Sequence, residues 1–489
     1  MNIAGLLNHV KVIQVTGNPE LKEVEKITID SREVDDKSLF VAIKGFNTDG
    51  HKFIPEVINK KACAVVLDNN SAVPEQLFAH NNCVKILVAD SRIALAEIAN
   101  AFYGEPSRKL TLIGITGTKG KSTTAFYIKN VLENAGFKTG LIGTLANYIG
   151  KKEIKTVLTT PQSHTINMLM KQMVDEGCTH CVMEVSSHAL HLHRADLLDF
   201  NFTVFTNITS DHMDYHVTFD NYLEAKKILF DMTGSDAQIV YNIDDKSAER
   251  LMADTKGKLH SYGQNERAEF RIHDIEYDLD GTSFRIDRNG TTYSLTTGLV
   301  GHFNAYNAAV GFAIGVLSGI KTENVIEGVK STPQVPGRFE VVSAGDKKAI
   351  IDYSHTADSL KQALTAVRHI VKDTRPVYTV FGCGGDRDRT KRPIMGAIAA
   401  EMSDFVYVTS DNPRTEDPNK IVEEVLIGIK TKNYKAIVNR EEAIKTAIEE
   451  SEDNAVILIA GKGHETYQEV NGVRSHFSDK ELAEKYLGI

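Results

Sequence analysis

A chain of 489 residues suggests about three domains. Hydrophobic residues make up 42% of the chain and charged residues 25%, a composition typical of a globular protein without low-complexity tracts. The formal net charge of −9 argues against a general nucleic-acid binder, which would normally be basic.

The chain start and the cysteines exclude several further classes. The opening residues MNIAGLLNH lack the basic region and apolar core of a signal peptide. No uninterrupted apolar stretch in the sequence approaches the roughly 20 residues that cross a bilayer, so we expect a cytoplasmic protein without a membrane partner. Five cysteines do not make a disulfide framework in so long a chain. Cys178 and Cys181 have the spacing of a redox or zinc pair, but Cys181 falls in an apolar strand, which favours burial.

The first predicted domain, residues 1–105, alternates short apolar runs with helical patterns. Strands are predicted at 40–43, 64–67 and 84–88, followed by an amphipathic helix at 94–101. Two polar stretches stand out, at 30–32 and 45–51. Surface turns explain these two stretches as well as a binding site does.

The second predicted domain, residues 106–335, begins with a strand, a glycine-rich turn and a helix. The apolar run 110–115 predicts a buried strand, and a helical pattern begins at Ala125. Between them lies the turn GTKGKS, the context in which a phosphate loop works. Ile115 replaces the first glycine of the usual pattern, so the motif is a variant. An ordinary glycine-rich turn is the alternative.

Phosphate binding explains the residue types in this turn. Glycines let backbone N–H groups curl around phosphate oxygens, and the helix N-terminus adds partial positive charge. Lys121 would reach the terminal phosphates, while the hydroxyl of Ser122 or Thr123 would hold Mg²⁺. The predicted ATP contacts of the turn are Gly117, Thr118, Lys119, Gly120, Lys121, Ser122 and Thr123.

Two later strands of this domain end in potential ligands. The strand at 181–183 runs into Glu184, where a second Mg²⁺ ligand is expected. The strand at 202–205 leads to a polar segment that contains His212, and α/β sheets place their sites at such strand ends. His188, His191 and His193 mimic a metal cluster, but we favour a helix or loop start there.

The third predicted domain, residues 336–489, follows a linker with two prolines and a glycine around 331–338. Its pattern resembles a doubly wound sheet, and its GCGGDR turn lacks the full spacing of a dinucleotide site, so NAD binding is not predicted. The predicted elements are strands at 348–353, 377–381, 405–409 and 455–460 and a helix at 359–371.

Six motifs occur in order: GTKGKST, EVSSH, SDHMDYH, GHFNAYN, PGRFE and DYSHTADSL. Together they resemble the Mur ligases, the ATP-dependent amide-forming enzymes of peptidoglycan precursor synthesis, over essentially the whole chain. The resemblance implies an α/β protein with an N-terminal UDP-binding domain, a central phosphate-loop ATPase domain with a parallel sheet, and a C-terminal Rossmann-like domain. It also implies a monomer that binds no nucleic acid.

The resemblance implies a reaction and a set of catalytic residues. ATP would phosphorylate the D-glutamate carboxylate of UDP-N-acetylmuramoyl-L-alanyl-D-glutamate, and an amino acid would displace phosphate. Two Mg²⁺ ions and Lys121 would neutralise phosphate charge. Ser122 and Glu184 would hold one ion, and Glu184 and His212 would help hold the second. A carbamylated lysine near the second ion aligns with Lys226, and Lys227 is expected to be a surface lysine.

Substrate contacts follow from the same alignment. Leu192 departs from members that place a glutamine there, which puts that contact in doubt. Nucleotide contacts are expected at Asn304, Asn307, Arg338 and Asp352, with the third domain closing over ATP, and the muramoyl-dipeptide contacts are expected at Ser31, Thr159, Thr160, Ser186 and Arg194.

The segment DNPR indicates which amino acid is added. In the family this segment accompanies addition of meso-diaminopimelate, whose second carboxylate suits the planar fork of Arg414. A lysine substrate would leave that guanidinium unpaired, and sites of this kind can discriminate by on the order of 10⁴. A surface arginine capping a turn is the alternative. The predicted diaminopimelate contacts are Arg387, Asp411, Asn412, Pro413, Arg414, Gly461 and Glu465.

Four other functions stay open. The chain could be a folylpolyglutamate synthase or a lysine-adding relative, although DNPR and the long first domain speak against both. It could also be a regulatory phosphate-loop ATPase that switches a partner, which would not need Ser31, Arg194 or Arg414. A catalytically dead scaffold is disfavoured because Lys121 and Lys226 are both present.

Overall fold

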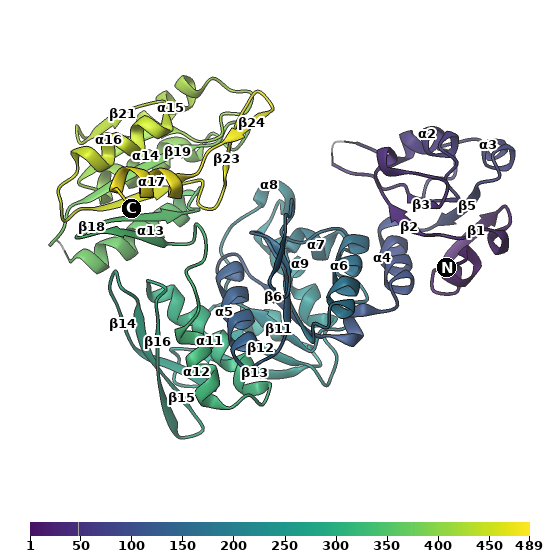
Figure 1. Cartoon of the computed structure of the whole chain (residues 1–489), viewed down its shortest axis with the longest axis horizontal. Coiled ribbons are helices and arrows are strands. Elements are labelled where there is room, and N and C mark those ends of the chain that lie inside the picture. Colours follow the sequence, from purple (N-terminus) through teal and green to yellow (C-terminus); the bar gives the residue numbers. More distant parts are fainter. Residues whose placement is uncertain (47, 373) are drawn as a thin grey trace. The chain divides into compact units, whose positions relative to one another are not determined.

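The computed structural model describes residues 1–46, 48–372 and 374–489. The chain divides into two compact units, Met1–Glu269 with Ala313–Ile320 and Phe270–Phe312 with Lys321–Ile489. The elements of each unit can be followed along the colour scale of Figure 1. Among the described residues, no helix combines the length and the apolar character that a membrane span requires.

The first unit opens with a small α/β sheet in the order β1-β5-β4-β3-β2. Three neighbouring pairs are parallel, and β1 pairs antiparallel with β5 at one edge. The strands are β1 (Val12–Thr16), β2 (Lys26–Thr28), β3 (Ser38–Val41), β4 (Ala64–Leu67) and β5 (Val84–Val88). The helices are α1 (Ile3–Leu7), α2 (Ile54–Asn59), α3 (Glu75–His80) and α4 (Ser91–Phe102).

Apolar side chains alternate between the two faces of this sheet. Leu39 and Val66 pack on one face with α1 and α4, while Phe40 and Val65 pack on the other with α2 and α3. Burial on both faces explains why β3, β4 and β5 read as continuous apolar runs in the sequence. The predicted strands and the helix are therefore confirmed, with ends that differ by a few residues.

The first unit continues with a larger sheet that carries the order β13-β12-β11-β6-β10-β7-β8-β9. Neighbours from β7 to β13 in this order are parallel, whereas β8 and β9 pair antiparallel at one edge. The strands are β6 (Thr111–Thr116), β7 (Thr139–Ile142), β8 (Asn147–Ile149), β9 (Lys152–Ile154), β10 (His180–Glu184), β11 (Phe202–Phe205), β12 (Gln238–Asn242) and β13 (Lys258–Gly263). The helices are α5 (Lys121–Asn134), α6 (Ser163–Asp175), α7 (Ser187–His191), α8 (Met213–His216), α9 (Phe219–Asp231) and α10 (Ala248–Met252).

The second unit contains an antiparallel ribbon and a mixed sheet. The ribbon is β14 (Phe270–Tyr277), β15 (Thr282–Arg288) and β16 (Thr291–Thr297), followed by α11 (His302–Leu317) and α12 (Thr322–Lys330). Nothing in the sequence reasoning predicted this ribbon. The sheet has the order β17-β18-β22-β19-β20-β21, parallel except for the edge strand β17.

The second sheet is doubly wound, as predicted. Its strands are β17 (Glu340–Ala344), β18 (Lys347–Asp352), β19 (Val377–Cys383), β20 (Phe405–Ser410), β21 (Tyr434–Ala436) and β22 (Val456–Ala460). Its helices are α13 (Ala357–Val371), α14 (Lys391–Met402), α15 (Pro418–Leu426), α16 (Arg440–Glu450) and α17 (Asp479–Leu487), and a hairpin of β23 (Tyr467–Val470) and β24 (Val473–His476) precedes α17. Figure 1 shows this hairpin and α17 in yellow.

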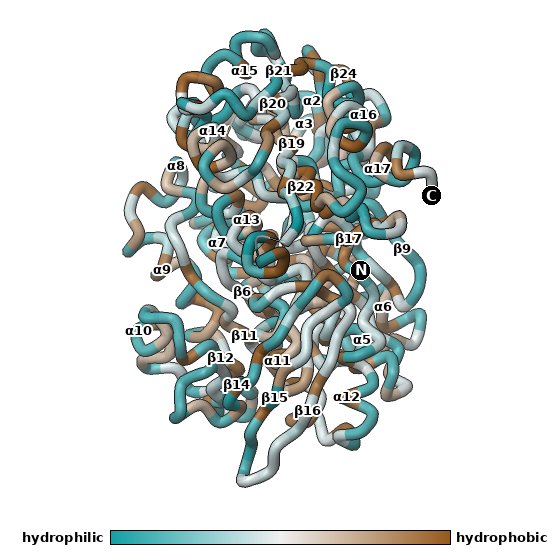
Figure 2. Tube along the Cα trace, turned by 90° about the vertical axis from the view of Figure 1, so that its left-hand side faces the viewer, coloured by the Kyte–Doolittle hydropathy of each residue, from teal (hydrophilic) through white to brown (hydrophobic). Residues whose placement is uncertain are grey.

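Buried apolar strands and amphipathic helices account for the sheet of the second unit. All five residues of β22 are buried, and apolar residues of α13 pack on one face while those of α16 pack on the other. Figure 2 shows the matching alternation of brown and teal along the chain. The carboxyl ends of β19, β20 and β22 then project three loops from one edge of the sheet, where α/β proteins place ligands.

Candidate active site

The turn after β6 has the backbone that a phosphate loop needs. Gly117 and Gly120 adopt φ values of +152° and +85°, which side-chain-bearing residues rarely adopt. A Cβ at Gly117 would also lie 1.9 Å from the Thr206 hydroxyl oxygen. Helix α5 begins at Lys121, four residues before the predicted start at Ala125. That prediction was wrong because the first turn of α5 carries polar side chains.

The carbonyl and amide groups of Asn207 hold the turn from the neighbouring strand end. Its backbone carbonyl accepts from Thr118 N at 2.8 Å, and its side chain exchanges two hydrogen bonds with Lys119, both 3.0 Å long. The Lys121 amine lies over the turn and donates to the carbonyls of Gly117 at 2.9 Å and Thr118 at 3.0 Å. Lys121 thus lies beside the backbone of the turn, and its contact with phosphate stays a prediction.

Glu184 forms a buried cluster of oxygen atoms with Ser122. Glu184 is 1% exposed, and one of its carboxylate oxygens accepts from the Ser122 hydroxyl at 3.0 Å. Thr144 adds two more hydrogen bonds to the same carboxylate, through its hydroxyl and its backbone N–H, each 2.9 Å long. A carboxylate beside hydroxyl groups is a donor set that suits Mg²⁺. The sequence reasoning missed Thr144, which lies in a short turn without a recognisable motif.

Four predicted substrate contacts are linked to this cluster by hydrogen bonds. The Thr159 hydroxyl is hydrogen-bonded to the Thr144 hydroxyl, with 3.0 Å between the oxygens, and the Thr160 hydroxyl donates to the backbone carbonyl of Glu184 at 2.8 Å. Ser186 N donates to the same Thr160 hydroxyl at 3.0 Å. Arg194 donates one guanidinium N–H to the Thr160 carbonyl at 2.9 Å, while its buried Nε has no hydrogen-bond partner.

Lys226 is a buried amine on α9. It is 1% exposed, donates to the carbonyl of Gly117 at 2.9 Å and lies 4.6 Å from the ring centroid of Tyr222. Burial, together with the positive charge of Lys121, lowers the pKa of Lys226 well below its ordinary value. No carboxylate of the described chain forms an ion pair with it. The structure therefore brings Lys226 and Lys121 to the same carbonyl oxygen.

His212 begins α8 with a φ of +56°. Burial lowers its pKa, and the charges of Lys121 and Lys226 act in the same direction. Among the described residues, no hydrogen bond connects His212 with Ser122 or Glu184. The Mg²⁺ ligand set proposed from the sequence is therefore brought together in part.

His188 and His191 lie in α7 and His193 follows it, which confirms the predicted helix or loop at these three histidines. His188 stacks on Tyr215 with ring centroids 4.2 Å apart, and His191 forms a 2.6 Å hydrogen bond with the Tyr215 hydroxyl. His193 lies beyond the helix and pairs with Asp196. In the described part of the chain, no three His, Cys, Asp or Glu side chains are grouped so that they could hold a metal ion.

Ser31 lies in the N-terminal sheet domain, apart from the other predicted substrate contacts. It is 8% exposed, its hydroxyl donates to Glu56 at 3.4 Å, and its carbonyl accepts from Lys60 at 2.8 Å. Among the described residues, none of its hydrogen bonds reaches the cluster around Glu184. Cys63, Cys83, Cys178, Cys181 and Cys383 are all buried and free, which confirms the predicted burial of Cys178 and Cys181.

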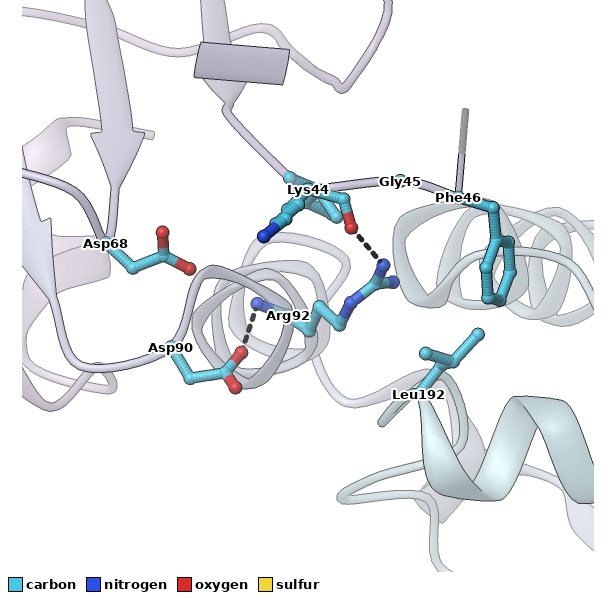
Figure 3. A pocket seen from close by; sticks show the side chains of 8 residues that line it. Lys44, Gly45, Phe46, Asp68, Asp90, Arg92 and Leu192 are labelled. Carbon is cyan, nitrogen blue, oxygen red and sulfur yellow. Dashed lines mark hydrogen bonds between the residues drawn. The ribbon is translucent and has the colours of Figure 1, made fainter. Parts of the chain in front are cut away.

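A pocket of about 400 Å³ lies within the first unit. It is lined by residues of the N-terminal sheet domain and by Leu192, which directly follows α7. Figure 3 shows Arg92 in its centre, donating to the Lys44 carbonyl at 2.7 Å, with Phe46 and Leu192 on one side. The pocket lining includes Gly45 and Phe46, the first two residues of the polar stretch 45–51 that stood out in the sequence. Asn47 of that stretch lies outside the described residues. The lining residues are Ile43, Lys44, Gly45, Phe46, Asp68, Asp90, Arg92 and Leu192.

The predicted nucleotide contacts after position 300 all lie in the second unit. Asn304 and Asn307 share a 3.0 Å hydrogen bond on α11, and both are buried. Arg338 lies 4.8 Å from the ring centroid of Tyr353, and its Nε is buried without a hydrogen-bond partner. Burial raises the pKa of Asp352, against the opposing effects of Ser354 and Arg338.

The loops after β20 and β22 bring together the predicted amino-acid contacts. The Asn412 amide donates to a Glu465 carboxylate oxygen at 2.7 Å, and Gly461 at φ +119° lies against Asp411. Arg414 donates to the Gly385 carbonyl at 2.8 Å.

Hairpin β23–β24 fixes the backbone of Arg414, whose φ is +52°. Arg414 N donates to the Glu469 carbonyl at 3.1 Å, and Asn471 N donates to the Arg414 carbonyl at 2.7 Å. Arg414 and the exposed Arg387 both border Gly384, because a Cβ there would lie 3.0 Å from an Arg414 nitrogen and 3.8 Å from Arg387 Cγ. The two predicted arginines therefore flank one glycine.

Three buried cations support these loops, and the sequence reasoning missed all of them. Lys462 contacts both Asn412 and Glu465. Arg392 pairs with Glu416 and Glu424, and Arg440 pairs with Asp479. No local signal identifies them, because each pairing except that of Lys462 with Glu465 joins residues more than twenty positions apart.

Comparisons with known proteins cover almost the whole chain. Family models match in three consecutive segments: "Mur ligase family, catalytic domain" over residues 23–103, "Mur ligase middle domain" over 115–315, and "Mur ligase, glutamate ligase domain" over 337–463. The chain is 41% identical over 490 residues to UDP-N-acetylmuramoyl-L-alanyl-D-glutamate--2,6-diaminopimelate ligase 1 of Clostridium acetobutylicum, covering 100% of this chain and 99% of the relative.

A second relative and a solved structure match the chain over the same length. The diaminopimelate ligase of Bacteroides fragilis is 40% identical over 493 residues, with full coverage of both chains. A solved structure of a UDP-N-acetylmuramoyl-L-alanyl-D-glutamate--2,6-diaminopimelate ligase matches with a TM-score of 0.71 at 28% identity, covering 100% of this chain and 99% of that one. The phosphate turn, the Glu184 cluster and the three matching family models agree: the chain belongs to the Mur ligase family.

Proposed function

We propose that the protein is an ATP-dependent ligase that joins meso-2,6-diaminopimelate to UDP-N-acetylmuramoyl-L-alanyl-D-glutamate in peptidoglycan precursor synthesis. Relatives about 40% identical over the full length carry that activity in their names. The observation that carries the specificity is Arg414, held by hairpin β23–β24 beside Gly384, with Asn412 of the same loop hydrogen-bonded to Glu465 of the loop after β22.

Catalysis starts with ATP at the phosphate turn. The backbone N–H groups of the turn and the Lys121 amine would neutralise the β- and γ-phosphates. Ser122 and Glu184 would hold Mg²⁺, which supplies further neutralisation of phosphate charge when bound. A D-glutamate carboxylate oxygen attacks the γ-phosphorus, the bond to the ADP oxygen breaks, and an acyl phosphate forms. The amine of diaminopimelate then attacks the acyl carbon, losing a proton as phosphate leaves.

Lys226 suits covalent modification by carbon dioxide. Its lowered pKa keeps a fraction of the amine neutral, and a neutral amine can attack CO₂ to form an N–C bond with release of one proton. The resulting carbamate carries a negative charge on two oxygens, in a buried position that lacks a carboxylate partner in the described chain. We infer that this carbamate, with Glu184 and His212, would help hold a second Mg²⁺.

The muramoyl-dipeptide substrate would extend from the Glu184 cluster toward the N-terminal sheet domain. Thr159 is hydrogen-bonded to Thr144, and Thr160 links the backbone carbonyl of Glu184 to Ser186 N, so the three residues lie next to the cluster. The Nε of Arg194, which has no hydrogen-bond partner among the described residues, offers a donor to an anionic group. The pocket at Lys44 and Arg92 adds two cations that suit a diphosphate. Ser31 would contact the uridine side, and Leu192 would replace a polar contact with an apolar one.

The remaining contacts are assigned to the second unit. Asn304, Asn307, Arg338 and Asp352 would bind ATP, and the unpartnered Nε of Arg338 supports this role for the arginine. Residues 1–105, 106–335 and 336–489 would then serve as the UDP-sugar, ATP and amino-acid domains of a monomer. The proposed diaminopimelate contacts are Arg387, Asp411, Asn412, Pro413, Arg414, Gly461 and Glu465.

Phosphate release tests the proposal directly. The purified protein is mixed with ATP, Mg²⁺, UDP-N-acetylmuramoyl-L-alanyl-D-glutamate and either meso-diaminopimelate or L-lysine, and the product is identified by mass spectrometry. We expect tripeptide formation with diaminopimelate and at most a trace with lysine. Turnover with lysine alone would keep the ligase and reject the specificity. If neither amino acid gives phosphate release or product, the proposal is rejected in favour of another acceptor or an ATPase switch.

A further inference from the structure

We propose that Lys462 is a positioning residue for the amino-acid substrate, acting through Asn412 and Glu465. The inference rests on the proposed function, because it concerns the residues assigned there to diaminopimelate. Lys462 is fully buried, and its Nζ lies 3.0 Å from Asn412 Oδ1 and 3.2 Å from Glu465 Oε2. The rings of Tyr467 and Phe477 surround the same amine, with centroids 5.5 and 5.9 Å away.

The amide of Asn412 has only one orientation that satisfies its neighbours. Its Oδ1 accepts from the Lys462 amine and from Glu469 N at 3.0 Å, so the opposite edge must present the NH₂ group. That NH₂ donates to Glu465 Oε2 at 2.7 Å. A flipped amide would point its NH₂ at two donors. Lys462 and Glu469 N together therefore determine which edge of Asn412 faces Glu465.

Glu465 is oriented by the same two contacts. Lys462 and Asn412 both bind Oε2, and the hydrogen bonds of the described residues leave Oε1 for an incoming ammonium group. The side chain of Glu465 is 16% exposed, so part of it is reachable by a ligand. Removing a buried cation leaves its partner charge uncompensated. Without Lys462, Glu465 Oε2 keeps only the Asn412 donor, so the carboxylate can turn away, and this change weakens binding of an ammonium group.

The experiment measures steady-state constants of the full-length protein with all three substrates. For Lys462→Met we expect KM for meso-diaminopimelate to rise about 10- to 100-fold, which is the range for lost hydrogen bonds to a charged group. The KM values for ATP and for the UDP-linked dipeptide should stay within about twofold of wild type. An unchanged diaminopimelate KM in a folded variant would overturn the inference. Wild type inactive in the same assay would instead reject the proposed function.

Lys85→Met provides a matched control for general damage. Lys85 is also a buried lysine, 3% exposed, that donates to an asparagine amide oxygen, Asn70 Oδ1, and lies 5.7 Å from the ring centroid of Phe78. It belongs to β5 of the N-terminal sheet domain. Its loss should lower the melting temperature without a selective change in KM for diaminopimelate. An equal rise in that KM for Lys85→Met would overturn the inference.

A double-mutant cycle separates positioning from a merely structural role. If Lys462 acts through Glu465, the variant with both Lys462→Met and Glu465→Gln should have about the same diaminopimelate KM as Glu465→Gln alone. Independent roles would multiply the two increases, and that result would contradict the inference. If Lys462→Met does not fold, Lys462→Gln keeps an N–H donor toward Asn412, and the same cycle is measured with this variant.

Discussion

Two lysines of this chain are equally buried but have opposite surroundings. Lys226 in the first unit is 1% exposed, contacts a backbone carbonyl and an aromatic ring, and has a pKa well below its ordinary value. Lys462 in the second unit is fully buried and forms an ion pair with Glu465. Burial alone therefore does not decide the role of a lysine. The presence of a carboxylate decides whether the amine is a fixed cation or a reactive neutral group.

The contrast extends to the sites around the two lysines. Buried arginines of the second unit have carboxylate partners before any ligand arrives, as Arg440 has in Asp479 and Arg392 has in Glu416. In the first unit, Glu184 is held by neutral hydroxyl and amide donors. Ligand charge would thus complete the first site, whereas the second site, under the proposed function, would be preorganised for a zwitterionic amino acid.

Removing the amine of Lys226 should have the largest effect. For Lys226→Met we expect kcat to fall by on the order of 10³, because the carbamate that we infer at this position would be lost. The free energy of unfolding, in contrast, should increase in this variant. A folded-state pKa below 10.5 means that the unfolded chain binds an extra proton, so Lys226 costs stability that grows as pH falls below 10.5. The variant should be more stable at pH 7, and its advantage should vanish as pH approaches 10.5.

Melting temperatures in CO₂-free buffer at pH 7 and pH 10 measure this difference in stability between Lys226→Met and wild type, the stability gap. Lys227→Met is the control, since Lys227 lies on the same helix but forms an ion pair with Asp231, whose side chain is 47% exposed, so its stability gap should be small at both pH values. Added bicarbonate should stabilise wild type and leave Lys226→Met unchanged. A stability gap that does not narrow with pH would mean that Lys226 is charged in the folded protein.

Arg414 is expected to have the second-largest effect. Arg414→Met should raise KM for meso-diaminopimelate by about 10- to 100-fold, because a charged hydrogen-bond donor to the distal carboxylate is lost. The preference for diaminopimelate over L-lysine should shrink by a similar factor, while KM for ATP stays constant. Initial rates of phosphate release with each amino acid give both ratios.

Arg389→Met is the matched control for this change. Arg389 lies in the neighbouring loop and pairs with Glu424, but its side chain is 60% exposed and no substrate contact is assigned to it. We expect wild-type preference in this variant. If Arg389→Met and Arg414→Met relax the preference equally, the specificity comes from the general charge of the loops and not from the fork of Arg414.

The sequence predicted what local patterns encode. The strand at 110–115 and the following turn were found because an apolar run and closely spaced glycines are signals within a dozen residues. The parallel α/β class followed from repeated apolar strands, and it was confirmed. The start of α5 was misplaced because the polar residues Lys121 to Thr124 carry no apolar period, although they form its first turn.

Residues defined by distant partners could not be predicted. Arg440 and Asp479 are separated by 39 positions, and neither has a motif that names the other. Thr144 is recognisable only through its hydrogen bonds to Glu184, 40 positions away. The ribbon β14–β16 was missed because its alternating pattern is weak, with several exposed threonines on β16. The site positions that the family motifs supplied, such as Arg194 and Arg338, stay predictions until they are substituted.

Breaking the ion pair between Glu416 and Arg392 should give the smallest effect, and this effect should depend on pH. Glu416 binds Arg392 through both carboxylate oxygens, at 2.8 and 3.0 Å, and these hydrogen bonds lower the pKa of Glu416 from 4.5 to about 2. A lowered carboxyl pKa means that the stabilisation is complete above pH 4.5 and is lost as pH falls toward 2. Glu416→Gln should therefore cost about 2 kcal/mol at pH 7 and progressively less below pH 4.5. Denaturant titrations at pH 7, 4 and 3 measure the difference, with Glu449→Gln as the control because its pair with Lys445 is exposed and 3.8 Å long. If the loss of unfolding free energy in Glu416→Gln stays constant down to pH 3, Glu416 acts through its shape and not through its charge. The order of the second site would then depend less on ion pairs than the contrast with Lys226 implies.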